Sequence, residues 1–116
     1  MTDSTTTEQT GARGPLAGMR VIELAHIMSG PICGMMLADM GADVIKVEKI
    51  PGGDDCRRFA PLVAGGESAS FMIVNRNKRG IALNLKTDGG REVLSKMLAS
   101  ADVVTENYRR GTMEKL

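Results

Sequence analysis

Aromatic residues, histidine and cysteine are all scarce in this 116-residue chain. Aromatic residues make up 3% of the sequence, with no tryptophan, so its core is predicted to be aliphatic and rich in the nine methionines. A single histidine, His26, excludes a metal site built from several imidazoles. The two cysteines, Cys33 and Cys56, lack the spacing of a metal site and are predicted to be free thiols in a reducing, cytoplasmic environment.

The chain also lacks an excess of charge of either sign. Fifteen basic and 14 acidic residues give a net charge of +1, which excludes a global field that would hold nucleic acid or an anionic membrane. No run of about 18 apolar residues is present to span a bilayer. Residues 1–14 lack the apolar segment of a signal peptide, and their Thr, Ser, Gly and Gln content predicts a disordered leader. Residues 15–116 then form at most one domain.

The stretch from residue 19 to residue 49 predicts a strand, a helix and a second strand. MRVIEL at 19–24 and VIKV at 44–47 are short, apolar and rich in β-branched residues. Between them, Pro31 suits a first helical position, Gly30 a cap and Gly41 a helix end. The predicted apolar face of this helix, which would lie on a sheet, consists of Ile32, Met35, Met36 and Met40.

The second half of the chain predicts another unit of the same kind. Residues 50–67, rich in Pro, Gly and Asp, form a loop that is longer than usual and is therefore expected to be functional. Residues 68–74 suit a short helix or a strand, of which the helix is favoured, and a strand is predicted at 80–85. Thr87 is expected to cap a helix over 89–100, whose buried face is Val93, Leu94, Met97 and Leu98, and a strand follows at 101–105.

The predicted architecture is an α/β fold with about four parallel strands. Such sheets are normally covered on both faces, and this sequence supplies little to cover them. Another helix is expected to begin near the end of the chain, with Thr112 as its cap. We therefore expect the chain to be the amino-terminal piece of a longer protein.

Polar residues follow each predicted strand, at 26–30, 48–49, 86–87 and 106–109, and a basic run precedes one strand at 75–79. Strand ends of a parallel sheet meet at one edge, where lysines, arginines and helix amides suit a ligand with several phosphates. A solvated charged face is the alternative interpretation of the basic run.

Single residues give weaker indications. His26 is interpreted as a hydrogen-bonded loop histidine rather than a catalytic base, and the adjacent Asp54 and Asp55 do not predict an acid–base pair. Glu48 stands where dinucleotide-binding proteins keep an acidic residue for the ribose. The first loop, HIMSGPICG, lacks the G-x-G-x-x-G pattern, so dinucleotide binding is disfavoured.

Two long stretches carry a family resemblance. PLAGMRVIELAHIMSGPICGMMLADMGADVIKVEKIPGGDD and NRNKRGIALNLKTDGGREVLSKMLASADVVTENYRRGTMEKL resemble the amino-terminal region of the family III CoA-transferases, a group that includes α-methylacyl-CoA racemase. The resemblance extends from about Pro15 to Leu116 and implies a truncated Rossmann-like domain in an interlocked homodimer.

The resemblance also implies a site for coenzyme A or acyl-CoA, bound as a substrate rather than as a tightly held cofactor. Carried over position by position, the implied contacts are Ile27, Met28, Lys49, Leu83, Asn84, Leu85, Lys86, Asn107, Tyr108, Arg109 and Lys115.

In the family, an aspartate attacks the acyl-CoA thioester, and CoA then passes to a second carboxylic acid. No catalytic residue is predicted here, and the 116 residues alone are expected to be inactive, because that nucleophile is matched by none of Asp39, Asp43, Asp54, Asp55, Asp88 and Asp102. Two alternatives remain open: a racemase of the same family, and a non-catalytic CoA-binding module.

Overall fold

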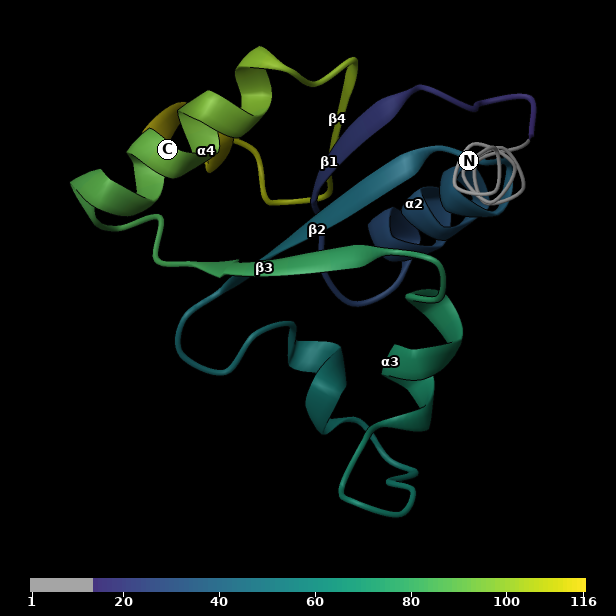
Figure 1. Ribbon diagram of the computed structural model, residues 1–116. Helices are drawn as coiled ribbons and strands as arrows, with labels where there is room; N and C mark the ends of the chain where they lie inside the picture. The colour runs from purple at the N-terminus through teal and green to yellow at the C-terminus, as the bar shows by residue number, and fades with distance from the viewer. Residues whose placement is uncertain (1–13) are drawn as a thin grey trace, which may run out of the picture.

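Four parallel strands form the centre of the structure, a computed structural model that describes residues 14–116. They are β1 (Arg20–Leu24), β2 (Asp43–Lys49), β3 (Arg79–Leu83) and β4 (Val103–Glu106), in the spatial order β3-β2-β1-β4 (Figure 1). The predicted α/β class with a parallel sheet is confirmed. The predicted leader lies, apart from Gly14, outside the described residues.

Helices pack on both faces of this sheet. Val21 and Val44 face α2 (Ser29–Asp39), where they form a core with Ala38 and Ala42. Ile22, Leu24 and Val47 face the opposite side, where Leu94 of α4 (Asp88–Ala99) completes a second core. Because side chains alternate along a strand, β1 can contribute to both cores, which is why nearly all of its residues are buried.

The two crossover connections differ in reach. Helix α2 links the neighbouring strands β1 and β2, as predicted, whereas α4 links β3 at one edge to β4 at the other. The second predicted unit therefore has parallel strands that do not pair with each other. The strand order reverses between β1 and β4, and ligands of open α/β sheets bind at the carboxyl side of such a reversal.

The predicted apolar face of α2 is wrong. Small residues, Gly30, Gly34 and Ala38, face the sheet, whereas the Met36 side chain is 56% exposed. The helix is apolar on most of its circumference, so the spacing of its large residues does not identify the buried side. Nor is Gly30 the cap, because the helix begins one residue earlier at Ser29, without a side-chain cap.

Helix α4 agrees closely with its prediction. The Thr87 hydroxyl accepts a hydrogen bond from the Gly90 N–H at 3.1 Å, as expected of an N-cap. Leu94 is buried, and Met97 and Leu98 pack against the same core. Val93, predicted to be buried, is exposed.

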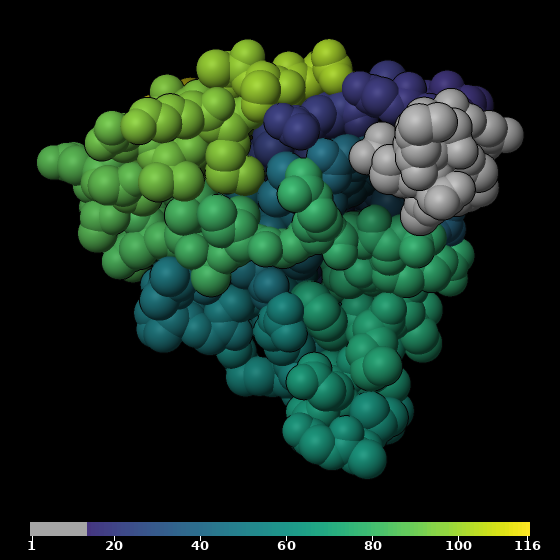
Figure 2. All heavy atoms as spheres, viewed as in Figure 1, coloured from purple at the N-terminus to yellow at the C-terminus, as the bar shows by residue number. Residues whose placement is uncertain are grey.

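The long loop after β2 forms a lobe beyond the sheet edge together with α3 (Ala69–Val74), as Figure 2 shows in teal. The loop contains the 3-10 helix η1 (Asp55–Arg58). As predicted, a short helix follows it, capped by the Ser68 hydroxyl, which accepts from the Phe71 N–H at 3.3 Å. The Arg57 guanidinium lies 3.8 Å above the Phe71 ring and joins η1 to α3.

After β4, the helix that was expected to follow Thr112 is the 3-10 turn η2 (Met113–Lys115). The Thr112 side chain makes no capping hydrogen bond, so that prediction is wrong. In the part of the chain that the structure describes, no helix has the length and apolar character needed to cross a membrane.

Candidate functional site

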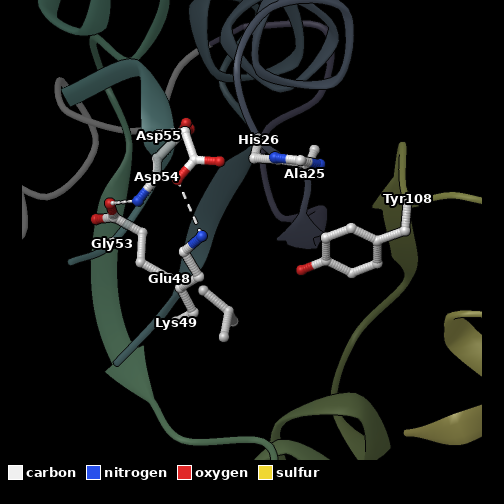
Figure 3. A pocket seen from close by; sticks show the side chains of 9 residues that line it. Ala25, His26, Glu48, Lys49, Gly53, Asp54, Asp55 and Tyr108 are labelled. Carbon is white, nitrogen blue, oxygen red and sulfur yellow. Dashed lines mark hydrogen bonds and ion pairs between the residues drawn. The ribbon is translucent and has the colours of Figure 1, made fainter. Parts of the chain in front are cut away.

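Three cavities adjoin one another at the carboxyl edge of the sheet. The inner cavity, of about 130 Å³, lies between the end of β1, the end of β2 and the loop that follows β2 (Figure 3). The residues that line it are Ala25, His26, Val47, Glu48, Lys49, Gly53, Asp54, Asp55 and Tyr108.

The second cavity, the strand groove, has a volume of about 380 Å³ and runs along the ends of β2 and β3. Leu83 and Leu85 give it an apolar floor, and Lys49 and Lys86 place two cations at its border. Such a combination suits a ligand with a hydrophobic chain and an anionic group. Asn84 and Tyr108 also line it.

The third cavity, the loop pocket, has a volume of about 440 Å³ and lies where the strand order reverses. It is lined by residues 26–29 on one side and by Asn107 and Arg109 on the other. All of the predicted contact positions except Lys115 line the strand groove, the loop pocket or the inner cavity. Lys115, exposed on η2, does not line any of them, although the nearby Thr112 and Leu116 line the strand groove.

Asn107 joins the ends of β1 and β4. Its Oδ1 accepts from the His26 N–H at 2.9 Å, and its Nδ2 donates to the His26 carbonyl oxygen at 2.9 Å. Gly30 permits this approach, because a Cβ at that position would overlap Ala25 and crowd Asn107. The backbone of His26 is thus hydrogen-bonded in the loop, and the role of its imidazole stays a prediction.

The side chains of His26 and Tyr108 border the inner cavity together. Their ring centroids lie 5.5 Å apart at an interplanar angle of 45°, and Figure 3 shows the Tyr108 hydroxyl pointing across the cavity towards the side of Glu48 and Lys49. Burial, followed by the negative charges of Asp54 and Glu106, raises the pKa of Tyr108. The phenol therefore stays protonated near neutral pH and can donate a hydrogen bond to a ligand.

A buried ion cluster, made of Glu23, Lys46, Asp54 and Lys78, lies beneath the loop pocket. Lys46 Nζ is 3.0 Å from Glu23 Oε2 and 2.9 Å from Asp54 Oδ2, and Lys78 Nζ is 2.9 Å from Glu23 Oε1. Each of the four side chains is at most 3% exposed. The two negative and two positive charges sum to zero, and their mutual attraction compensates for the desolvation of each charge.

Asp54 remains ionised in this cluster. Burial raises the pKa of its carboxyl group, but hydrogen bonds from the Cys56 N–H, Lys46 and the Ile27 N–H outweigh that effect and hold the pKa below its ordinary value. A carboxylate so fully engaged is not available as a base, in agreement with the prediction that Asp54 and Asp55 form no acid–base pair.

Sequence reasoning missed this cluster, although a signal was present. Glu23 and Lys46 are charged residues inside VIEL and VIKV, two strands predicted to be buried, and a charge at an inward position requires a partner. The identity of the partners depends on tertiary contacts, since Lys78 and Asp54 come from a strand-leading segment and a loop.

The basic run at 75–79 does not join the cavities. Arg76 pairs with Asp39 at 2.8 Å, Arg79 pairs with Asp43 at 2.7 Å, and Lys78 belongs to the buried ion cluster. Arg76 and Arg79 are more than half exposed, as the interpretation of a solvated face expects, whereas Lys78 is buried, and none of the three lines a cavity at the carboxyl edge. The run precedes β3 and so lies away from the carboxyl edge, where its cations instead anchor α2 and β2.

The Glu48 carboxylate is likewise held in hydrogen bonds within the protein. Its carboxylate accepts two hydrogen bonds from the Arg57 guanidinium at 2.7 Å each and one from the Asp54 N–H at 2.8 Å. The bonds from Arg57 hold the pKa of Glu48 below its ordinary value despite its partial burial. This carboxylate fixes the loop after β2 and is not free to bind a ribose, which agrees with the disfavoured dinucleotide hypothesis.

Lys49 is tethered but exposed. Its ammonium lies 2.9 Å from Asp55, which also pairs with Arg58 at 2.6 Å. An anionic ligand in the strand groove could replace Asp55 as the partner of Lys49 at little cost, because the pair is solvated. Within residues 14–116 no group of three potential ligands could hold a metal ion, and Cys33 and Cys56 are free thiols.

Comparison with known proteins identifies the family. Residues 16–116 match the family described as CoA-transferase family III. The chain belongs to CoA-transferase family III.

Relatives of known name agree with this assignment. The chain is 49% identical over 106 residues to the succinyl-CoA:mesaconate CoA-transferase of Haloarcula marismortui, covering 88% of this chain and 26% of that protein. It is 46% identical over 115 residues to the succinate–glutarate CoA-transferase of Agrobacterium fabrum, covering 94% of this chain and 29% of that protein. The chain thus spans about a quarter of the length of these curated relatives.

A solved structure of a CAIB/BAIF family protein from Brucella suis matches with a TM-score of 0.81 and 45% identity. The match covers 88% of this chain and 28% of that protein. The fold described above is therefore also found in that protein.

Proposed function

We propose that this chain forms the CoA-binding end of an enzyme that moves CoA between an acyl-CoA thioester and a carboxylic acid. One observation carries the proposal beyond family membership: the implied contact positions, scattered between Ile27 and Arg109, line adjoining cavities at one edge of the sheet. Lys49 and Lys86 would bind phosphate groups of CoA, and Leu83 and Leu85 would contact its pantetheine chain.

The proposed reaction uses an aspartate of the intact enzyme. Its carboxylate attacks the thioester carbonyl carbon and expels CoA thiolate, which leaves an acyl anhydride. The thiolate then attacks the enzyme's own carbonyl carbon, releases the donor acid and forms an enzyme–CoA thioester. The acceptor carboxylate repeats these two steps in reverse, which yields the new acyl-CoA and regenerates the aspartate.

We place that nucleophile outside these 116 residues. Asp39, Asp43, Asp54 and Asp55 are each held in an ion pair in this structure, and Asp102 accepts a hydrogen bond from the Arg20 N–H at 2.8 Å. The isolated chain is accordingly expected to show no turnover. A homodimer, which rests on the family resemblance, and a cytoplasmic location, which rests on the two free cysteines, are further parts of the proposal.

The test is a transfer assay on the intact protein. Succinyl-CoA is incubated with short dicarboxylic acids, which the names of the relatives suggest as acceptors, and new acyl-CoA esters are separated by chromatography. We expect one acceptor to accumulate as its CoA ester. Exchange of the α-proton of a 2-methylacyl-CoA in deuterium oxide, without any CoA transfer, would instead establish the racemase. CoA binding with neither reaction would establish a non-catalytic module.

A further inference from the structure

Ile27 has a backbone conformation that β-branched residues rarely adopt. Its φ angle is +68°, in the left-handed region, where the side chain crowds the backbone. The residue lies in the loop pocket, directly before Met28 and the first turn of α2. A strained conformation of this kind persists only where the surrounding structure holds it in place, and such positions concentrate at functional sites.

Asp54 helps to hold Ile27 in this conformation. Its Oδ1 accepts hydrogen bonds from the Ile27 N–H and the Cys56 N–H, both at 2.9 Å, while its Oδ2 lies 2.9 Å from Lys46 Nζ. Its own N–H donates to Glu48 at 2.8 Å. A single buried carboxylate therefore connects the strained residue to β2 and to η1, although Asp54 is 27 residues away from Ile27 in the sequence.

The same buried ion cluster holds the loop on both sides of Ile27. Before it, the Ala25 carbonyl oxygen accepts from Lys46 Nζ at 2.9 Å. After it, the Pro31 carbonyl oxygen accepts from Lys78 Nζ at 2.8 Å. The segment from residue 25 to residue 31 is thus fixed at three backbone atoms, all of them by members of one charge-balanced group beneath the loop pocket.

We propose that the buried ion cluster positions the loop 25–31 for coenzyme A, with Asp54 as the positioning residue that keeps Ile27 in its left-handed conformation. This inference rests on the proposed function, because it assigns CoA as the ligand of that loop. Asp54 itself does not touch the ligand in this scheme. The cluster matters for affinity because a loop that is ordered before binding loses less conformational entropy when the ligand arrives.

The test compares two double variants of the intact protein that carry the same buried charge. Both include K46M, which removes one cation, together with either D54N or D54L, which removes one anion and leaves the pair of Glu23 and Lys78. Asparagine keeps an oxygen that can accept from the Ile27 N–H, whereas leucine has a similar size and no acceptor. The two proteins therefore differ mainly in the hydrogen bonds that this oxygen accepts, from the Ile27 N–H and the Cys56 N–H, and exchange measured at each amide reports on each bond separately.

The first readout is amide hydrogen exchange of the peptide that contains residues 25–31, which needs no ligand. We expect exchange at Ile27 to be at least tenfold faster in K46M/D54L than in K46M/D54N, while the helix α4 exchanges equally in both. Equal exchange at Ile27 overturns the inference whether or not CoA binds. Faster exchange throughout the protein also overturns it, since Asp54 would then serve general stability alone.

The second readout is the dissociation constant of CoA, measured by titration calorimetry on the same proteins. We expect K46M/D54L to bind CoA at least tenfold more weakly than K46M/D54N. Adding I27G to both should reduce this ratio to below threefold, because glycine adopts a positive φ without support. An unchanged ratio in the I27G background contradicts the role of Ile27. A wild-type protein that binds no CoA refutes the proposed function and the assignment of the ligand, whereas the exchange comparison still decides whether Asp54 fixes the loop.

Discussion

Asn107 and His26 exchange two hydrogen bonds of 2.9 Å at the point where the strand order reverses. The backbone pairing of β1 with β4 ends at Leu24 and Glu106. Beyond that point, the Asn107 side chain takes over the hydrogen bonding between the two chain segments. The bonds hold the two walls of the loop pocket at a fixed separation, so the shape of that pocket depends on a side chain and not only on the sheet.

Replacing Asn107 tests this link. N107A removes both hydrogen bonds and should lower the free energy of unfolding by about 2 kcal/mol, at roughly 1 kcal/mol for each bond. N107D keeps an acceptor for the His26 N–H but sets a carboxylate oxygen against the His26 carbonyl oxygen, which now lies 2.9 Å from Nδ2, so its loss should be at least as large as that of N107A. Urea unfolding of the three proteins measures the order. An N107A protein as stable as the wild type would show that the two bonds do not stabilise the fold.

Gly34 of α2 lies directly over Glu23, and a Cβ at Gly34 would overlap the Glu23 carboxylate. G34A should therefore destabilise the protein by about 3 kcal/mol, because the helix must move away from the sheet or the buried ion cluster must rearrange. G89A in the first turn of α4 is the matched control, since a Cβ there meets nothing within 4 Å. We expect G89A to be neutral or slightly stabilising. Thermal unfolding distinguishes the two, and equal midpoints would contradict the close packing of α2.

Local sequence signals predicted the parts of this fold that local chemistry determines. Thr87 is an N-cap because a hydroxyl there reaches a free amide of the first helical turn. The strand ends were predictable because parallel strands share one direction, and this alone grouped Lys49 with Lys86 and His26 with Asn107.

Features that depend on partners distant in sequence could not be predicted in the same way. The buried side of α2 was mistaken because Met36 resembles a core residue, whereas the limited space above Glu23 admits only Gly34. The role of Lys78 was mistaken because a basic run gives no indication of which of its members will meet a buried acid. Likewise, the residues of β3 and β4 do not indicate that these strands lie at opposite edges of the sheet.

Glu48 should make stability depend on pH in the acid range. Hydrogen bonds from Arg57 hold its pKa below the ordinary value of 4.5, so the folded state binds a proton at Glu48 less readily than the unfolded state. Its stabilising effect is fully present above that value and is lost as the pH falls through the folded pKa. E48Q should accordingly be less stable than the wild type at pH 7, and the difference should shrink as the pH falls below 4.5 towards the folded pKa.

Urea unfolding from pH 7 to pH 3 measures this difference directly. E92Q is the control, because Glu92 forms only an exposed pair with Lys96 at 3.3 Å, and its replacement should have little effect at any pH. A constant difference between E48Q and the wild type over the whole range would show that the ion pair with Arg57 is not what the substitution removes.

Lys86 lines the strand groove, and its removal should weaken CoA binding. If its ammonium pairs with a phosphate, K86A in the intact protein should reduce the binding free energy of CoA by about 1–3 kcal/mol, and the loss should shrink as salt is added because the site is exposed to solvent.

K96A removes a cation from the exposed pair on α4 with no cavity contact and should leave CoA affinity unchanged. Wild-type affinity in K86A would remove Lys86 from the proposed site. Equal weakening in K86A and K96A would indicate general electrostatic attraction rather than a contact. Dephospho-CoA, compared with CoA on the wild type and K86A, then shows which phosphate Lys86 reaches: the effect of the substitution should vanish with dephospho-CoA only if the partner is the phosphate that this analogue lacks.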